Sequence, residues 1–132
     1  MKHLTAILAA AALAGCATTN PAQLDEARRT VPTCTAGADC AAKWDAAQLW
    51  IVQRAGFKLQ TSTGVVLQTY GPSTAMQDST RLAVTVTREP DGPQRFRIVP
   101  RIGCGNPFGC TPEVVPALLD FNRTVSAAGV QQ

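Results

Sequence analysis

The chain has 132 residues, of which 45% are hydrophobic and 16% are charged. This length allows one domain, and this balance of apolar and charged residues excludes a disordered, highly charged tail. The formal net charge of +3, from 12 Lys and Arg against 9 Asp and Glu, is too small to indicate nucleic acid as a partner.

Residues 1–15 have the pattern of a cleaved export signal. Lys2 supplies a positive charge, and an almost wholly apolar run follows from Leu4 to Ala14. As a helix this run would be about 16 Å long, roughly half the hydrocarbon thickness of a bilayer, so a membrane-spanning helix is the weaker interpretation. One alternative for this segment is an ordinary signal peptide, with the cysteine at position 16 following it by chance.

The end of the run, Leu13-Ala14-Gly15-Cys16, resembles the lipobox of bacterial lipoproteins. The resemblance implies cleavage before Cys16, a thioether-linked diacylglycerol on its sulfur and acylation of the new amino group. Several acyl chains give stable anchoring, whereas a single chain binds a membrane only marginally. Ala17 follows in place of an aspartate, which by resemblance to enterobacterial sorting rules favours the outer membrane. We therefore expect a protein lipid-anchored in the cell outer membrane and facing the periplasm.

Residues 16–33 are expected to form the lipidated cysteine and a flexible tether. Pro21 and Pro32 bracket a charged stretch with too few apolar residues to be buried, so one loose helical turn is the most structure we expect there. A flexible tether of this length spans about 20–25 Å, which keeps the domain near the membrane. The folded domain is expected over 34–128, followed by a short tail, 129–132.

A helix is predicted from Cys40 to Ala55, with Asp39 as its N-cap and Gly56 as a stop signal. Its apolar stripe at helical spacing consists of Cys40, Trp44, Ala47, Ile51 and Ala55. Trp50 lies about 120° round the helix from Trp44. We expect Trp50 to pack under the tether or a loop, or, if exposed, to mark an interface.

Four strands are predicted next, because the apolar period changes from about four residues to two. They occupy residues 57–62, 65–69, 82–87 and 95–102. Gly64 and Asp91-Gly92 are turn signals that divide them into two hairpins. Pro100 lies inside the last run and indicates an edge position or a bulge.

A last helix is predicted after Thr111 and Pro112, with Pro116 disturbing its first turn. Its apolar stripe is Val114, Leu118, Phe121 and Val125. The order helix, four strands, helix predicts an α+β fold, namely a four-stranded antiparallel sheet with two helices on one face.

Four cysteines follow Cys16 in two pairs with five intervening residues each, Cys34 with Cys40 and Cys104 with Cys110. In an oxidising compartment they are expected to form structural disulfides, which a small domain needs. The spacing favours pairing within each pair, while a cross-pairing that joins the two helix starts stays open. The wide spacing disfavours a zinc site, and the Cys-x-x-Cys and Cys-x-x-Cys-His motifs of redox and haem sites do not occur.

Catalytic sites lack their usual residues in this sequence. His3 is the only histidine and leaves with residues 1–15, which excludes Ser-His-Asp, Cys-His and histidine–metal sites from the processed chain. Acids near helix ends, such as Asp39 and Glu113, are far more often caps than catalytic pairs. We therefore expect no enzymatic activity, no cofactor and no metal.

One surface is a candidate for binding a partner. The sheet face opposite the helices carries Arg95, Arg97 and Arg101, and the neighbouring strand, residues 82–87, presents small side chains beside them. Such an arginine face suits anionic lipid, lipopolysaccharide or an acidic protein. Arginine on an exposed strand also commonly serves solubility alone. Trp50 is the second candidate position.

Part of this pattern resembles a group of small uncharacterised proteobacterial lipoproteins. The residues that carry the resemblance are Cys34-x5-Cys40, Trp44, Trp50, Gly56-Phe57, Leu59-Gln60-Thr61, Arg97-Ile98-Val99, Phe108-Gly109-Cys110 and Phe121-Asn122-Arg123. The match spans most of residues 34–125 and implies no activity. A looser likeness to the helix-grip-like domains of the C lipoprotein of the outer-membrane β-barrel assembly machinery implies a fold only.

We therefore expect a structural or adaptor lipoprotein of the envelope, whose partners are the membrane and an envelope protein. A module that binds an anionic envelope ligand through the arginine face is the alternative, and a carboxylate-dependent cell-wall hydrolase is a third hypothesis. An exposed apolar patch would favour the adaptor, and a continuous basic face would favour the ligand binder. A cleft with two carboxylates of perturbed pKa would favour the hydrolase.

Overall fold

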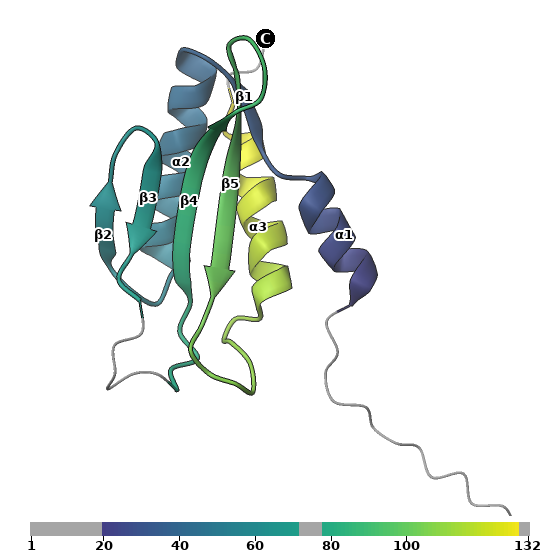
Figure 1. Ribbon diagram of the computed structural model, residues 1–132, viewed down its shortest axis with the longest axis vertical. Helices are drawn as coiled ribbons and strands as arrows, with labels where there is room; N and C mark the ends of the chain where they lie inside the picture. The colour runs from purple at the N-terminus through teal and green to yellow at the C-terminus, as the bar shows by residue number, and fades with distance from the viewer. Residues whose placement is uncertain (1–19, 72–77, 130–132) are drawn as a thin grey trace, which may run out of the picture.

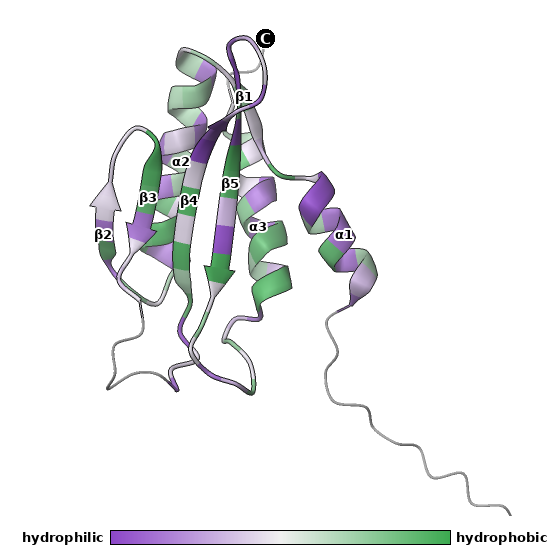
Figure 2. Ribbon diagram, viewed as in Figure 1, coloured by the Kyte–Doolittle hydropathy of each residue, from purple (hydrophilic) through white to green (hydrophobic). Residues whose placement is uncertain are grey.

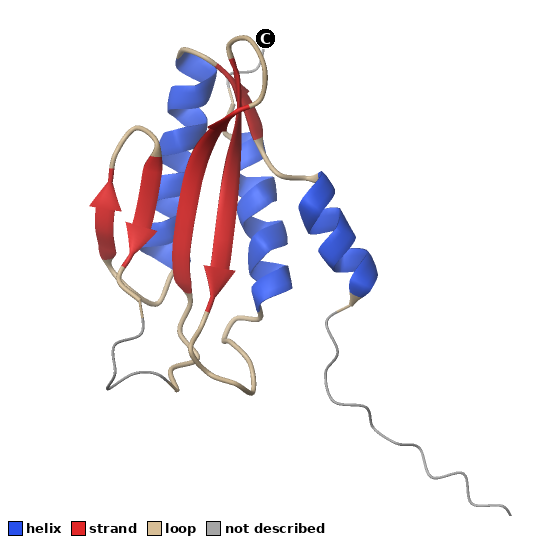
Figure 3. Ribbon diagram, in the orientation of Figure 1, coloured by secondary structure: helices blue, strands red, loops and turns tan. Residues whose placement is uncertain are grey.

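The computed structural model describes residues 20–71 and 78–129. The elements, in chain order, are α1 Pro21–Arg29, β1 Thr33–Thr35, α2 Ala38–Arg54, β2 Leu59–Ser62, β3 Val66–Thr69, β4 Ala83–Pro90, β5 Arg95–Gly103 and α3 Val114–Ala127 (Figures 1 and 3). The predicted signal and lipidation site, residues 1–16, lie outside the described residues, as do residues 130–132 of the predicted tail.

All five strands join one antiparallel sheet in the order β1-β5-β4-β3-β2. The β4–β5 hairpin forms its long centre, and the β2–β3 hairpin extends it on one side. α2 and α3 lie together on one face of the sheet, as Figure 1 shows. The predicted α+β class, the antiparallel sheet and both hairpins are therefore confirmed.

β1 is a strand that the sequence analysis missed. Residues 33–35 pair with residues 95–97 of β5 at the edge of the sheet. A strand of three residues is too short to show an apolar alternation, so the pattern had no means of indicating it. The sheet has five strands instead of the predicted four.

α1 replaces the described part of the predicted tether. The flexible chain expected over 16–33 is wrong from Pro21 onward, because residues 21–29 are helical. The Asn20 side chain accepts a hydrogen bond from the Ala22 N–H at 3.0 Å and caps the helix. Pro21 suits the first helical position, where no backbone donor is needed. The described residues therefore form three helices instead of the predicted two.

Asn122 of α3 holds α1 in place. Its side chain is 1% exposed, and its amide nitrogen donates to the Ala27 carbonyl at 2.8 Å and to the Thr30 hydroxyl at 3.1 Å. Both acceptors lie at the C-terminal end of α1, where the last carbonyls have no partner within the helix. The contact therefore supplies hydrogen-bond donors to acceptors at the end of α1 and joins the N-terminal segment to the domain.

α2 begins two residues earlier than predicted. Gly37 precedes it with φ 102°, a backbone conformation that favours glycine. Asp39 is consequently not the N-cap but lies in the first turn, where its carboxylate accepts from the Thr35 N–H at 2.9 Å and pairs with Lys43 at 3.3 Å. Four residues of the predicted stripe are buried, namely Cys40, Trp44, Ala47 and Ile51.

The strands bury alternate residues against the two helices. The fully or almost fully buried apolar residues include Leu67 of β3, Val84 and Val86 of β4, Ile98 of β5 and Leu82 just before β4. Figure 2 shows hydrophobic and hydrophilic positions following one another along β4 and β5. The alternation predicted for these two strands is confirmed, and the core lies between the sheet and the helices.

α3 begins just ahead of Pro116, which lies in its first turn. Proline is tolerated there because the first N–H groups of a helix have no partner within it. Two later residues of the predicted stripe, Phe121 and Val125, are fully buried. In the first turns, Val115 and Ala117 are buried, whereas Val114 and Leu118 were predicted to be. The buried stripe therefore begins on a different face of the helix.

Pro100 lies on an edge of β5 that no described strand covers. β1 covers only residues 95–97 of that edge, and the Ile98 N–H donates to the Pro32 carbonyl at 2.8 Å. Backbone groups two residues apart point to the same edge of a strand, so an N–H at position 100 would point to this uncovered edge. Proline has no N–H and leaves no free donor there.

Both disulfides join neighbours in the sequence, Cys34 with Cys40 and Cys104 with Cys110. The favoured pairing is therefore confirmed, and the cross-pairing does not occur. The first disulfide ties β1 to the start of α2 inside the core. The second closes the loop between β5 and α3.

Replacing Asn122 by alanine is expected to release α1 while the rest of the domain stays folded. The variant leaves the Ala27 carbonyl without its donor, which costs about 1–3 kcal/mol for a buried polar group. Amide hydrogen exchange in residues 21–29 should accelerate, and exchange in β4 and β5 should not. Thr124→Ala, exposed on the same helix, is the control. Equal exchange of α1 in the two variants would show that Asn122 does not hold the helix.

Candidate functional site

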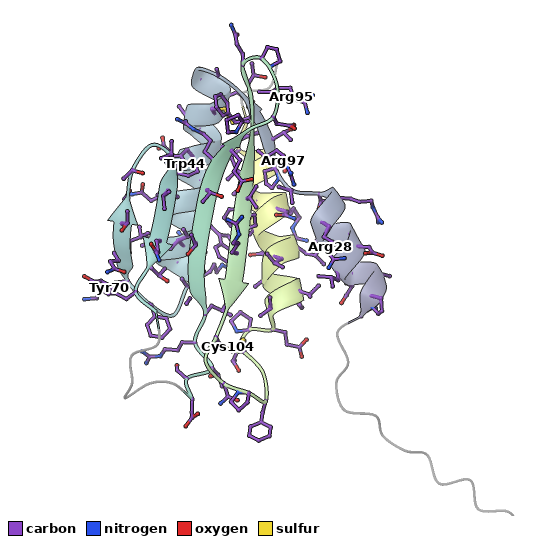
Figure 4. The ribbon with its side chains drawn as sticks, viewed as in Figure 1. Arg28, Trp44, Tyr70, Arg95, Arg97 and Cys104 are labelled. Carbon is purple, nitrogen blue, oxygen red and sulfur yellow. A yellow bond between two sulfur atoms is a disulfide. The ribbon has the colours of Figure 1, made fainter. Side chains whose placement is uncertain are left out.

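The open face of the sheet carries the predicted arginine face. Arg95, Arg97 and Arg101 of β5 are exposed on the side away from the helices. Thr33 and Thr35 of β1 lie opposite two of them in the register and are short enough to leave them uncovered. Figure 4 labels Arg95 and Arg97 toward the end of the sheet that holds β1.

Acidic side chains accompany these arginines. Arg95 pairs with Asp91 at 2.9 Å, and Arg101 pairs with Glu89 at 3.3 Å. Arg97 lies opposite Glu89 in the strand register. The arginine face is therefore not the open basic surface that the sequence analysis expected. The predicted strand 82–87 ends three residues before β4 does at Pro90, and so it left out Glu89.

Glu89 belongs to a polar network across β4 and β5. The Thr87 hydroxyl donates to the Glu89 carboxylate at 2.7 Å, and Arg101 donates to both side chains. The hydrogen bond from Thr87, together with the hydrogen bond and charge of Arg101, lowers the pKa of Glu89 against a smaller opposing effect of burial. A carboxyl with a lowered pKa is ionised at neutral pH and is unsuited to act as a general acid.

Trp50 has a structural position. The side chain is 4% exposed, and its ring meets Phe121 of α3 edge to face at 5.2 Å. Its indole N–H donates to the Asp120 carboxylate at 2.8 Å. Trp50 therefore packs on α3 instead of under the tether or a loop, and it presents no surface to a partner.

Asp120 is the second carboxyl with a perturbed pKa. The hydrogen bond from Trp50 lowers the pKa of Asp120, and the hydrogen bond and charge of Arg123 act in the same direction against burial. Asp120 lies in the helix layer, whereas Glu89 lies on the open sheet face. These two carboxyls do not share a cleft, and both pKa shifts favour the ionised form.

Two shallow grooves flank α1. One, of about 240 Å³, is mostly apolar and lies where Leu24 faces Pro100 of β5 and Leu118 of α3. The other, of about 750 Å³, lies between α1 and α3 and contains Glu26 and Arg123. Because both grooves depend on α1 being helical, no local pattern in the sequence indicates them.

Several large apolar side chains of the described residues are exposed. They are Leu49 (55%) and Val52 (65%) on α2, Val65 (54%) in the β2–β3 turn, Tyr70 (53%) after β3 and Phe108 (98%) in the loop of the second disulfide. None of these residues belongs to the candidate sites predicted from the sequence. Leu49 and Val52 fall off the predicted stripe of their helix, which was the available signal for those two.

Potential metal ligands form no cluster in the part of the chain that the structure describes. No group of three or more His, Cys, Asp or Glu side chains there is placed to hold a metal ion. The cysteines at 34, 40, 104 and 110 are bonded to one another in disulfides. Within the same residues, no helix combines the length and the apolar character needed to cross a bilayer.

Trp50→Phe is expected to raise the pKa of Asp120 toward its ordinary value, because the variant removes the indole donor. A carboxyl whose pKa is lowered by folding stabilises the fold above its unfolded pKa, and this contribution is lost as the pH falls through the folded pKa. The variant should therefore lose less stability than the wild type on acidification below about pH 4. NMR titration of the carboxyl carbon and urea denaturation measure the two effects.

Thr87→Ala is the matched control for this titration. It removes the hydroxyl donor of Glu89 and should raise the pKa of that residue alone. An Asp120 pKa that is the same in Trp50→Phe and in the wild type would contradict the assigned cause.

No protein-family model matches this chain, and no curated protein or solved structure matches it either. The lipobox and the likeness to proteobacterial lipoproteins therefore stay predictions from the sequence. The structure establishes an α+β domain in which both cysteine pairs with five intervening residues form disulfides.

Proposed function

We propose that this chain is a lipid-anchored envelope protein with a structural or adaptor role. The lipobox-like stretch at 13–16 supports a lipid on Cys16, and Ala17 supports the outer membrane as its location. Two disulfides suit a domain that works in an oxidising compartment such as the periplasm. A processed chain without histidine is consistent with a role that involves no catalysis.

The exposed apolar pair on α2 carries the adaptor hypothesis. Leu49 and Val52 are 55% and 65% exposed, and three residues of separation place them on one side of the helix. Exposed polar residues flank the pair, Asp45 on one side and Gln53 on the other. An apolar patch with a polar rim is typical of a site that contacts another protein.

The helix that presents this pair is rigidly held. On its opposite side, the Trp44 indole N–H donates to the Thr63 carbonyl at 2.9 Å, and Trp50 bonds to Asp120. α2 is therefore tied to both the β2–β3 turn and α3. A surface held in this way loses little conformational entropy when a partner binds.

Binding of an anionic envelope ligand at the arginine face is the second candidate function. Arg97 favours it, because it is exposed and, among the described residues, forms no ion pair or hydrogen bond through its side chain. Glu89 and Asp91 on the same face reduce the attraction for an anion. We therefore place this function behind the adaptor role.

Photo-crosslinking in living cells separates the two candidates. A photoreactive amino acid at Val52 is expected to give one discrete protein adduct, and this adduct should disappear when Leu49 is replaced by glutamate. The same probe at Arg97 is the matched comparison. Adducts from Arg97 alone, to lipid or lipopolysaccharide, would establish the second candidate. The absence of any adduct from Val52 would contradict the adaptor role of this helix face.

Cys16→Ser tests the anchor separately from the partner. A serine cannot form the thioether, so the variant is expected to leave the membrane fraction and to lack the mass of the acyl chains in mass spectrometry. Retention in the membrane with an unchanged mass would show that Cys16 is not the lipidation site.

A further inference from the structure

One end of the domain, here called the proximal end, is built from loops that are bonded to one another. It comprises residues 55–58, 70–71, 78–82 and 104–113. The Thr111 N–H donates to the Thr80 carbonyl at 2.8 Å, and the Gly56 N–H donates to the Leu82 carbonyl at 3.1 Å. The β2–β3 turn and the β4–β5 turn lie at the opposite end (Figure 1).

The chain enters the domain at the proximal end. α1 runs in the same direction as α3, because Leu24 shares a groove with Leu118 and, further along both helices, Ala27 bonds to Asn122. The start of α1 at Pro21 therefore lies level with the start of α3, which follows directly after the loop 104–113. Figure 1 shows both helix starts at this end of the sheet.

A lipid on Cys16 would hold this end close to the membrane. Cys16 precedes Asn20 by four residues, and four residues reach at most about 14 Å when fully extended. β5, with 9 residues, is by comparison about 30 Å long. A link of this length brings the proximal end to the membrane surface more readily than the opposite end.

Phe108 projects from the proximal end on a braced loop. Its side chain is 98% exposed, and the disulfide between Cys104 and Cys110 closes the loop that carries it. The Asn106 side chain accepts from the Phe108 N–H at 2.8 Å and donates to the Asp78 carbonyl at 2.7 Å. An aromatic ring that a fixed loop exposes to water is stabilised when binding places it against an apolar surface.

Tyr70 and two basic side chains share this end. Tyr70 is 53% exposed, and its N–H donates to the Lys58 carbonyl at 2.9 Å. Figure 4 places Tyr70 and Cys104 away from the labelled arginines of β5. Lys58 and Arg81 are exposed, and neither forms an ion pair within the described residues. Exposed aromatic rings with basic neighbours match the composition of protein surfaces at a membrane interface.

We propose that the proximal end rests on the lipid surface that carries the anchor, with Phe108 inserted at the level of the head groups. This inference depends on the anchor at Cys16 proposed above. It gives the domain a defined orientation in which the strands stand away from the membrane. The arginine face and the apolar pair on α2 then lie on the sides of the domain, where they are accessible to a partner in the periplasm.

Fluorescence quenching by lipid tests this orientation. The full lipidated chain is reconstituted in vesicles of phosphatidylethanolamine and phosphatidylglycerol, with and without lipids brominated in their acyl chains. Trp emission of Phe108→Trp is expected to fall roughly two-fold in brominated vesicles. Val65→Trp, at a position that is 54% exposed on the opposite end, is the matched control and should stay unquenched. Wild-type protein gives the background from the buried Trp44 and Trp50.

Flotation of the vesicles separates the possible failures. Quenching at 108 but not at 65, with the protein floating, supports the orientation. Floating protein that is unquenched at 108, or quenched equally at both positions, overturns the orientation and leaves the anchor intact. Protein that does not float overturns the anchor itself, and the orientation with it.

Discussion

Trp50 and Phe121 meet edge to face at 5.2 Å, and this contact sets how α2 and α3 lie side by side over the sheet. The Trp50 indole also reaches Asp120, so an apolar and a polar contact fix the same geometry. Once α3 is placed, Asn122 on another side of that helix is directed at α1. The arrangement of the N-terminal segment, and with it the end at which the chain enters the domain, therefore follows from the seam between two helices far apart in the sequence.

The elements that could be predicted are those whose own residues bury an apolar face. The period of two in β4 and β5 and the stripe of α2 are each visible within one element. α1 has a mostly polar sequence, and Asn122, which donates to its Ala27 carbonyl, stands 95 positions further along the chain. Arg88 is a charged residue at a position of β4 where alternation predicts an apolar one, and one of its partners, Trp44, is also distant in the sequence. It occupies an inward position of β4 with its guanidinium between the rings of Trp44 and Phe96, where two aromatic faces replace an anionic partner.

The candidate site could be predicted only in part, because its character depends on partners across the sheet. The exposure of Arg97 follows from alternation, but its place opposite Glu89 follows from the register, which the sequence does not display. Trp50 and Asp120 are separated by 70 positions, so no local pattern relates them. In the sequence, Phe108 stands out only as part of the stretch Phe108-Gly109-Cys110 that carries the resemblance to small lipoproteins. Its exposure arises from the disulfide and the Asn106 brace, which are properties of the folded loop.

Pro100 has a consequence for the behaviour of many copies together. An uncovered strand edge offers hydrogen-bonding groups to a strand of another molecule, and such pairing can continue into aggregates. Under the anchor and orientation proposed above, copies on one membrane surface would present the same strand edges at the same height. Leu24 of α1 flanks this stretch of β5, and Pro100 lacks the N–H that a hydrogen-bonded ladder with a neighbouring strand would need there. Pro100 thus disfavours pairing of β5 with a strand of another molecule along the stretch that β1 does not cover.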